Sequence, residues 1–337
     1  MRVLVTGAGG QVGSDLVTAL DGHDVIACAR AQLDVGDGEA CMRTILAACP
    51  DVVVHAAAYT DVDGCEFDSA RGWRANVLGS WNVARAAHEA GAFLIAISSD
   101  YVFDGSASEP YDEDAPLAPL GAYGRSKAAG EGVALGANPD ATAIVRASWV
   151  YGRVGKNFVK TMLRLATERE VVEVVDDQTG SPAWSADLAR ALVRLASAPR
   201  AGIYHVTNGG STTWFGFARE VFAAAGYDPE RVRPTTTVAL ARPAPRPRYS
   251  VLGDRMWRLA GLPSLPHWRD ALRAALPEIL GDLSGRRSSQ RNGRKRKPTE
   301  GVPWALHGGP NWISRKAEAS LPGIGFGLRD TRCQVAE

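Results

Sequence analysis

The first half of the chain alternates short β-branched apolar runs with longer segments whose apolar residues recur at helical spacing. The apolar runs predict strands at residues 3–5, 24–28, 51–55, 93–97 and 142–146. The intervening segments predict helices at residues 12–20, 42–48, 80–90 and 123–135. Strands that alternate with helices in this way are typical of βαβ units. We therefore expect an α/β fold over residues 1–150, with a doubly wound parallel sheet of the Rossmann type.

The pattern becomes less regular after residue 150. Helices are predicted at residues 158–168, 187–196 and 215–225, and strands at 171–175 and 203–207. Ligands of open α/β sheets bind beyond the carboxyl ends of the strands. We therefore expect residues 151–283 to form a smaller C-terminal α/β lobe that binds the substrate beside the sheet, with the chain crossing between the two domains.

The composition changes from residue 284 onward to Ser, Arg, Gly, Lys and Pro, which predicts a disordered tail over residues 284–337. This basic tail is either simply solvated or binds a partner or nucleic acid. Residues 286–297 hold seven Arg or Lys and no acid, so the net charge of +1 leaves the rest of the chain acidic. We expect no nucleic-acid binding by the folded body, since that requires a positive face for the phosphates.

The five cysteines form no CxxC pair and are widely scattered, which argues against a disulfide framework or a zinc site. A reducing, cytoplasmic location fits this usage best. The first residues lead into a glycine-rich loop too early for a secretory signal, and we find no uninterrupted apolar run near the length of a membrane span. We therefore expect neither export nor a membrane partner.

A glycine-rich loop, TGAGGQVG at residues 6–13, directly follows the first predicted strand and opens a helix. Gly7, Gly10 and Gly13 have the GxxGxxG spacing that lets the backbone turn tightly and approach a pyrophosphate at the helix N-terminus. The loop, with Gln11 and Val12, therefore predicts a dinucleotide site. The alternative is a glycine-rich turn without a ligand.

The end of the second predicted strand bears on the choice of coenzyme. Sites that prefer NAD usually place an acid there, whereas this chain has Arg30. We expect NADPH to be accepted, with Asp34 and Val35 flanking the adenine, and the preference between NADPH and NADH stays open. Arg30 is otherwise an ordinary exposed arginine.

Tyr123 and Lys127 lie one helical turn apart, and Ser99 lies just past the end of the predicted strand at residues 93–97. A carbonyl that receives a hydride must also take a proton, and a phenol of ordinary pKa gives up its proton reluctantly near neutrality. We expect Lys127 to lower the pKa of Tyr123 and to hold the nicotinamide ribose, while Ser99 binds the substrate oxygen. The alternative is that Tyr123 and Lys127 are surface residues of a helix.

Segments along the whole chain, up to the tail, resemble one family. They are the glycine loop, residues 55–60, Asp63, Glu66, and residues 98–103, 123–127, 146–151, 157–162, 177–182, 204–205 and 246–247. The chain resembles the extended short-chain dehydrogenases/reductases and, within them, the dTDP-4-dehydrorhamnose reductases. Two departures are Ser99, where members more often have Thr, and residues 62–66, where the altered sequence puts the loop conformation in question.

The resemblance implies reduction of the C4 ketone of dTDP-4-dehydro-L-rhamnose to dTDP-L-rhamnose by NADPH or NADH. It implies that Ser99, Tyr123 and Lys127 are catalytic, and that Ser99, Asp100, Tyr101 and Trp149 contact the dTDP-sugar. For Trp149, the alternative is ordinary packing under the lobe. Further coenzyme contacts are implied for Ala57, Ala58 and Tyr59.

The same resemblance leaves competing functions open. One alternative is another nucleotide-sugar short-chain dehydrogenase, either a 4-epimerase or a C4-ketoreductase. The 4-epimerases and 4,6-dehydratases share the loop and the Tyr-Lys pair, but dehydratases resemble a Thr-Asp-Glu pattern where this chain has Tyr101 in place of Glu. A non-catalytic nucleotide-sensing regulatory subunit is the alternative from another class. A homodimer also stays open, as does a Mg²⁺ ion, for which Asp15 is either a ligand or a solvated acid.

Overall fold

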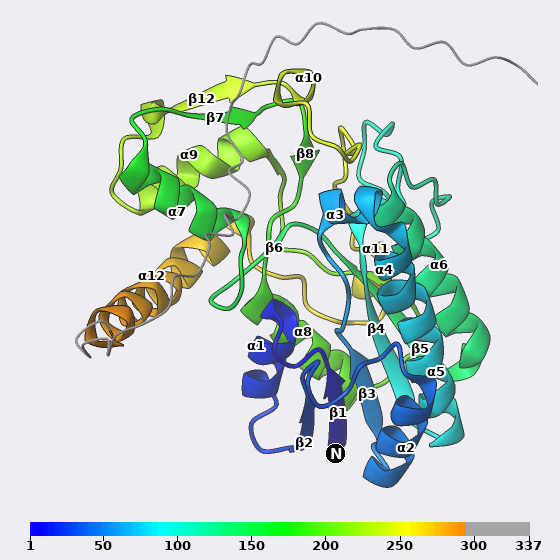
Figure 1. Cartoon of the computed structure of the whole chain (residues 1–337). Helices are drawn as coiled ribbons and strands as arrows, with labels where there is room; N and C mark the ends of the chain where they lie inside the picture. Colours follow the sequence, from blue (N-terminus) through cyan, green and yellow to red (C-terminus); the bar gives the residue numbers. More distant parts are fainter. Residues whose placement is uncertain (294–337) are drawn as a thin grey trace, which may run out of the picture. The chain divides into compact units, whose positions relative to one another are not determined.

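A six-stranded parallel sheet, in the order β10-β5-β4-β3-β1-β2, forms the centre of the fold (Figure 1). The computed structural model describes residues 1–293. Met1–Gln290 form one unit of the chain and Arg291–Glu337 another. The strands are β1 (Arg2–Thr6), β2 (Asp24–Cys28), β3 (Val52–His55), β4 (Phe93–Ser99), β5 (Thr142–Ala147) and β10 (Gly202–His205). The prediction of a doubly wound α/β fold is confirmed.

Helices cover both faces of this sheet, because the strands carry apolar side chains on both sides. One face packs against α1 (Gln11–Ala19) and α8 (Ser185–Ser197). The other packs against α2 (Gly38–Ala48), α5 (Gly79–Glu89) and α6 (Ala122–Ala137). Strand β1 lies between β2 and β3, so the direction in which the sheet grows reverses at the carboxyl end of β1. Ligands of such sheets bind at this switch point.

After residue 150, the predicted boundary between the two domains, the chain returns to the main sheet. The strand predicted at 203–207 is β10, which pairs with β5 in the main sheet, and α8 packs beside α1 on the sheet face. Both elements bury apolar residues, among them Leu188, Leu192 and Tyr204. They therefore extend the Rossmann sheet, although they lie within the range predicted for the second lobe.

A second apolar core joins α7 (Phe158–Glu168), α9 (Trp214–Ala224) and the first turns of α12 (Trp268–Gly293). Three two-stranded sheets accompany them: β6 (Val150–Tyr151) with β9 (Ala183–Trp184), β7 (Val172–Val175) with β12 (Val232–Thr235), and β8 (Thr179–Gly180) with β11 (Thr212–Thr213). The remaining helices are short: α3 (Val62–Phe67), α4 (Ser69–Trp73), a π-helix (Arg74–Leu78), α10 (Thr237–Leu240), α11 (Arg255–Leu259), and three 3₁₀ turns at 100–102, 139–141 and 229–231.

Helix α12 continues through residue 284 to Gly293, within the range predicted for the tail. Its buried first turns nucleate the helix, and adding further residues to an existing helix costs little. The rest of the predicted tail, residues 294–337, lies outside the described residues. Within residues 1–293, no helix combines the length and the apolar character that a bilayer crossing requires.

Candidate active site

The glycine loop turns sharply between β1 and α1, and two of its positions have no room for a side chain. Gly7 has φ +68°, and a Cβ there would lie 2.6 Å from the backbone nitrogen of Ala57. A Cβ on Gly13 would lie 2.2 Å from the carbonyl oxygen of Gly7. Gly10 is the N-cap of α1 and provides no side-chain cap, so the N–H groups of the first turn are available to an anionic ligand.

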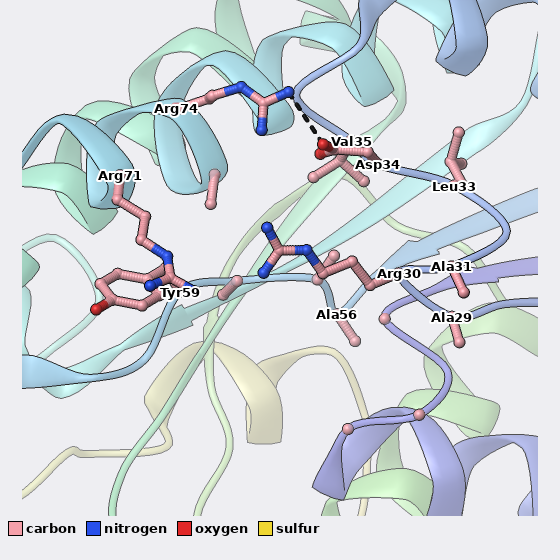
Figure 2. Close-up of a pocket in the computed structure, with 16 residues that line it drawn as sticks. Ala29, Arg30, Ala31, Leu33, Asp34, Val35, Ala56, Tyr59, Arg71 and Arg74 are labelled. Atoms are coloured by element: carbon pink, nitrogen blue, oxygen red, sulfur yellow. Dashed lines mark hydrogen bonds and ion pairs between the residues drawn. The ribbon is translucent and has the colours of Figure 1, made fainter. Parts of the chain in front are cut away.

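A cavity of about 480 Å³ lies beside this loop (Figure 2). Most residues predicted to hold the coenzyme line it: Gly7, Gly10, Arg30, Asp34, Val35, Ala57, Ala58 and Tyr59. The others do not line it. Gln11, Val12 and Gly13 form the first turns of α1, where the Gln11 side chain accepts a hydrogen bond from Asn157 at 3.0 Å. Tyr123 and Lys127 lie on α6.

Two arginines that the sequence reasoning missed also line this cavity. Arg71 comes from α4, and its guanidinium carbon lies 4.7 Å from the centre of the Tyr59 ring. Arg74 begins the π-helix and donates to Asp34 with a nitrogen to oxygen distance of 3.0 Å. Asp61 and Asp68 are the N-caps of α3 and α4. Such capping residues were the signal in the sequence from which these two helices could have been predicted.

Ser99, Tyr123 and Lys127 are brought together at the end of β4, and each is less than one-tenth exposed. Ser99 is the last residue of β4, and its hydroxyl hydrogen-bonds with the Tyr123 phenol. Lys127 reaches from α6 to β4, where its Nζ donates to the Ile97 carbonyl oxygen at 2.8 Å. The described geometry therefore joins the phenol, the ammonium and the hydroxyl that the sequence pattern predicts to act together.

The electrostatics of Tyr123 correct one expectation. Burial raises the pKa of the Tyr123 phenol above its ordinary value, and the hydrogen bond with Ser99 offsets this only in part. Burial also lowers the pKa of Lys127 to about 8. The predicted lowering of the Tyr123 pKa by Lys127 is wrong for this structure, because removal of the phenol from water dominates and the ammonium is bonded to a backbone carbonyl.

The predicted substrate contacts lie in different surroundings. Asp100 is buried behind Ser99 and accepts hydrogen bonds from Ser99 and Ser148, both at 3.1 Å. Burial raises the pKa of Asp100 to about 6. The ring of Tyr101 packs edge-on against Tyr123, with ring centres 5.8 Å apart. Asp100 is therefore placed to hold Ser99 rather than to face a ligand.

Trp149 has φ +47°, which is unusual for a large side chain. Its ring stacks on Trp214 with centres 3.6 Å apart. A Cβ on Gly180 would lie 2.5 Å from the Trp149 ring, so glycine is required beneath the indole. The left-handed backbone is thus held by packing from two other segments, and the sequence reasoning missed Trp214 as the partner.

Helix α3 connects α6 to a distant part of the chain. Asp63 is buried and accepts from Arg242, from the Ala244 backbone at 3.2 Å and from Arg246 at 2.8 Å. Glu66 Oε1 accepts from the backbone nitrogen of Ala122, the first residue of α6, at 2.6 Å. The sequence drew attention to Asp63 and Glu66 but gave them no role. They hold the start of α6 and the segment 242–246 against one helix.

The sequence model of a family described as the RmlD substrate binding domain matches residues 1–280. The chain belongs to this RmlD family. It is 48% identical over 287 residues to a dTDP-4-dehydrorhamnose reductase of Streptomyces griseus, covering 83% of this chain and 94% of the relative. It is 41% identical over 285 residues to a dTDP-4-keto-6-deoxy-D-glucose reductase of Streptomyces niveus, covering 84% and 99%.

A solved structure shares both the fold and much of the sequence. The crystal structure of dTDP-4-dehydrorhamnose reductase from Bacillus anthracis in complex with NADP has a TM-score of 0.80 and 39% sequence identity. The similarity covers 82% of this chain and 99% of that chain. The family predicted from the sequence motifs is confirmed.

Asp15, the residue considered as a Mg²⁺ ligand, is hydrogen-bonded to another residue of the chain. Its Oδ2 accepts a short hydrogen bond from the Ser185 hydroxyl, which ties α1 to α8. In residues 1–293, no group of three or more His, Cys, Asp or Glu side chains is arranged to hold a metal ion. Asp15 thus has a structural partner.

Proposed function

We propose that this chain reduces the C4 ketone of dTDP-4-dehydro-L-rhamnose to dTDP-L-rhamnose. The proposal is carried by the meeting of Ser99, Tyr123 and Lys127 at the end of β4, in a chain of the RmlD family. A nicotinamide dinucleotide fits the neighbouring cavity, because Gly7 and Gly13 let the loop turn tightly against its own backbone and the N–H groups of the first turn of α1, beside Gly10, are free of a side-chain cap and can bind a pyrophosphate. When bound, NADPH or NADH supplies the hydride.

Side chains of this protein would bind the substrate oxygen and supply the proton that it takes up. When substrate binds, the Ser99 hydroxyl would exchange its hydrogen bond to Asp100 for one to the ketone oxygen, which positions that oxygen beside the Tyr123 hydroxyl. Because burial raises the pKa of Tyr123, the phenol keeps its proton at neutral pH. As the C–O double bond becomes single, the oxygen takes this proton, which leaves a phenolate near the Lys127 ammonium. The product is the alcohol at C4.

The test is NADPH consumption by the purified full-length chain with dTDP-4-dehydro-L-rhamnose, and identification of the product by NMR. We expect turnover by the wild type, and the loss of turnover in Tyr123→Phe but not in Tyr227→Phe. Tyr227 is a suitable control because it packs on Phe222 in the second core. No consumption by the wild type with coenzyme bound would instead favour a nucleotide-sensing subunit.

A second candidate substrate is dTDP-4-keto-6-deoxy-D-glucose, because the Streptomyces niveus relative that is 41% identical is named for it. The same assay with this sugar separates the two, since the preferred substrate has the higher kcat/KM. A 4-epimerase would instead purify with tightly bound NAD and interconvert sugars without net coenzyme consumption. In this proposal the enzyme acts in the cytoplasm, which the scattered cysteines support. Light scattering of the purified chain tests the proposed homodimer.

We further propose that Arg30 favours NADPH over NADH. It lines the coenzyme cavity at the end of β2, where sites that prefer NAD carry an acid. A guanidinium there would bind the 2′-phosphate. We expect Arg30→Ala to lower the ratio of kcat/KM for NADPH to that for NADH by about tenfold. An unchanged ratio would remove this role.

A further inference from the structure

Asp34 is the first acid after β2, and it lines the coenzyme cavity. An acid in this part of a dinucleotide site usually accepts a hydrogen bond from the ribose hydroxyl, which favours NADH. Here both carboxylate oxygens already accept hydrogen bonds. Oδ1 accepts from the Gly36 backbone at 3.0 Å, and Oδ2 accepts from Arg74 at 3.0 Å. These bonds keep the pKa of Asp34 below its usual value, so it stays ionised and paired.

Arg74 is held in place from a second direction. A Cβ on Gly36 would lie 2.7 Å from the guanidinium carbon of Arg74, so the guanidinium lies directly against the backbone at this glycine. The ion pair with Asp34 is half-exposed, with 51% of the Arg74 side chain and 42% of the Asp34 side chain accessible. A pair of this exposure contributes little to stability, so Arg74 can be replaced without unfolding the chain.

The charges at this end of the cavity favour an anion. Figure 2 shows Arg30 and Arg74 on the same cavity, with the Asp34 carboxylate beside Arg74. Two guanidiniums and one carboxylate leave a net positive charge. A guanidinium carries five N–H donors, and the bond from Arg74 to Asp34 uses one of them. Arg71 differs because it packs over the Tyr59 ring.

We propose that Arg74 is a specificity-determining residue that selects NADPH over NADH in two ways. It neutralises Asp34, which would otherwise repel a 2′-phosphate and accept a hydrogen bond from a 2′-hydroxyl. It also adds a second guanidinium beside Arg30 for the phosphate. This inference rests on the proposed use of a nicotinamide coenzyme and extends it to a residue from a distant helix.

The test measures coenzyme binding alone, so it does not depend on the keto sugar. NADPH and NADH are titrated into the full-length wild type, Arg74→Ala, and the double variant Arg74→Ala with Asp34→Asn, and Kd is read from the coenzyme fluorescence. Arg43→Ala is the matched control, because Arg43 pairs with Glu39 on the exposed side of α2 and does not line the cavity. A second pair of probes, 2′,5′-ADP and 5′-AMP, isolates the adenosine end.

We expect Arg74→Ala to lower the preference for NADPH by at least about tenfold, partly through tighter NADH binding to the unpaired Asp34. The double variant should lose that gain in NADH affinity and keep the weak NADPH binding. Arg43→Ala should leave both affinities unchanged. An unchanged preference in Arg74→Ala would overturn the inference. If the wild type binds neither coenzyme, the proposed function fails with it, whereas a shifted preference without sugar turnover would remove only the proposed reaction.

Discussion

The coenzyme side and the proton-delivery side of the proposed active site are built from different kinds of group. On the coenzyme side, Gly7, Gly10 and Gly13 lie within one short loop that packs closely against its own backbone. On the proton-delivery side, groups from distant segments meet, as when the part-buried Glu66 on α3 accepts from the backbone nitrogen of the first residue of α6. The first kind of site is set by local chain geometry, and the second depends on tertiary packing. Substitutions on the two sides should therefore impair different properties of the enzyme.

Tyr123→Phe is expected to separate turnover from coenzyme binding most sharply. Removing the hydroxyl removes the proposed proton donor but leaves the buried ring and its packing against Tyr101 in place. We expect kcat to fall by about 10² to 10⁴ while the Kd of NADPH stays within about twofold. Stopped-flow turnover and a fluorescence titration measure the two quantities. Full turnover by the variant would show that another group delivers the proton.

On the coenzyme side, Gly13→Ala should instead weaken coenzyme binding. Its Cβ would lie 2.2 Å from the Gly7 carbonyl oxygen, so the loop must move. We expect a loss of about 1–3 kcal/mol in the free energy of unfolding and an increase of at least about tenfold in the Kd of NADPH. Gly132→Ala is the control, because a Cβ there meets nothing within 4 Å. Equal coenzyme affinities in the two variants would contradict the close approach of the loop.

A smaller effect is expected from Glu66, which contacts the start of α6 and is not one of the residues proposed to be catalytic. Glu66→Ala leaves the Ala122 N–H without its acceptor, so the first turn of α6 is less well held. We expect kcat to fall by about tenfold, the Kd of NADPH to be unchanged, and stability to fall by about 1 kcal/mol. Glu66→Gln keeps an oxygen acceptor and should restore most of kcat. If Gln and Ala behave alike, the negative charge matters rather than the hydrogen bond.

The smallest effect concerns pH and the buried Asp100. Its pKa in the folded chain is about 6, above the ordinary value for an unfolded aspartate, so protonation stabilises the folded state. This contribution is largest at low pH and is lost as the pH rises through about 6. Relative to Asp100→Asn, the wild type should therefore gain about 1 kcal/mol of stability between pH 7 and pH 5. Urea unfolding at both pH values measures it, and a constant difference would argue against the raised pKa.

The sequence predicted the elements whose information is local. Strand β2 and helix α7 have the predicted bounds, and the other predicted helices and strands of the sheet differ by a few residues at their ends. The region 62–78 was not predicted as helical, because α3 and α4 are too short to show an apolar period and a π-helix follows them. Arg71 and Arg74 were therefore missed, although they line the coenzyme cavity.

For the candidate site, the sequence supplied a prediction of which residues act together, but not of their electrostatics. The spacing of Tyr123 and Lys127 is a helical property and can be read along the chain. The direction of the Tyr123 pKa shift was wrong, because it depends on burial that only the packed structure reveals. The position of Asp34 beside Arg74 likewise depends on a contact between segments 40 residues apart. The position of Asp100 behind Ser99 depends on how the chain turns after β4.

The bond between Glu66 and Ala122 also bears on the order in which the molecule becomes functional. The two residues are 56 positions apart, so α6 acquires this partner only when α3 has docked against it. In a refolding experiment, far-ultraviolet circular dichroism should recover before reductase turnover does, since most helices and strands can form while the phenol is still unanchored. Mutations that slow the docking of α3 would then delay the appearance of active enzyme without changing its final yield.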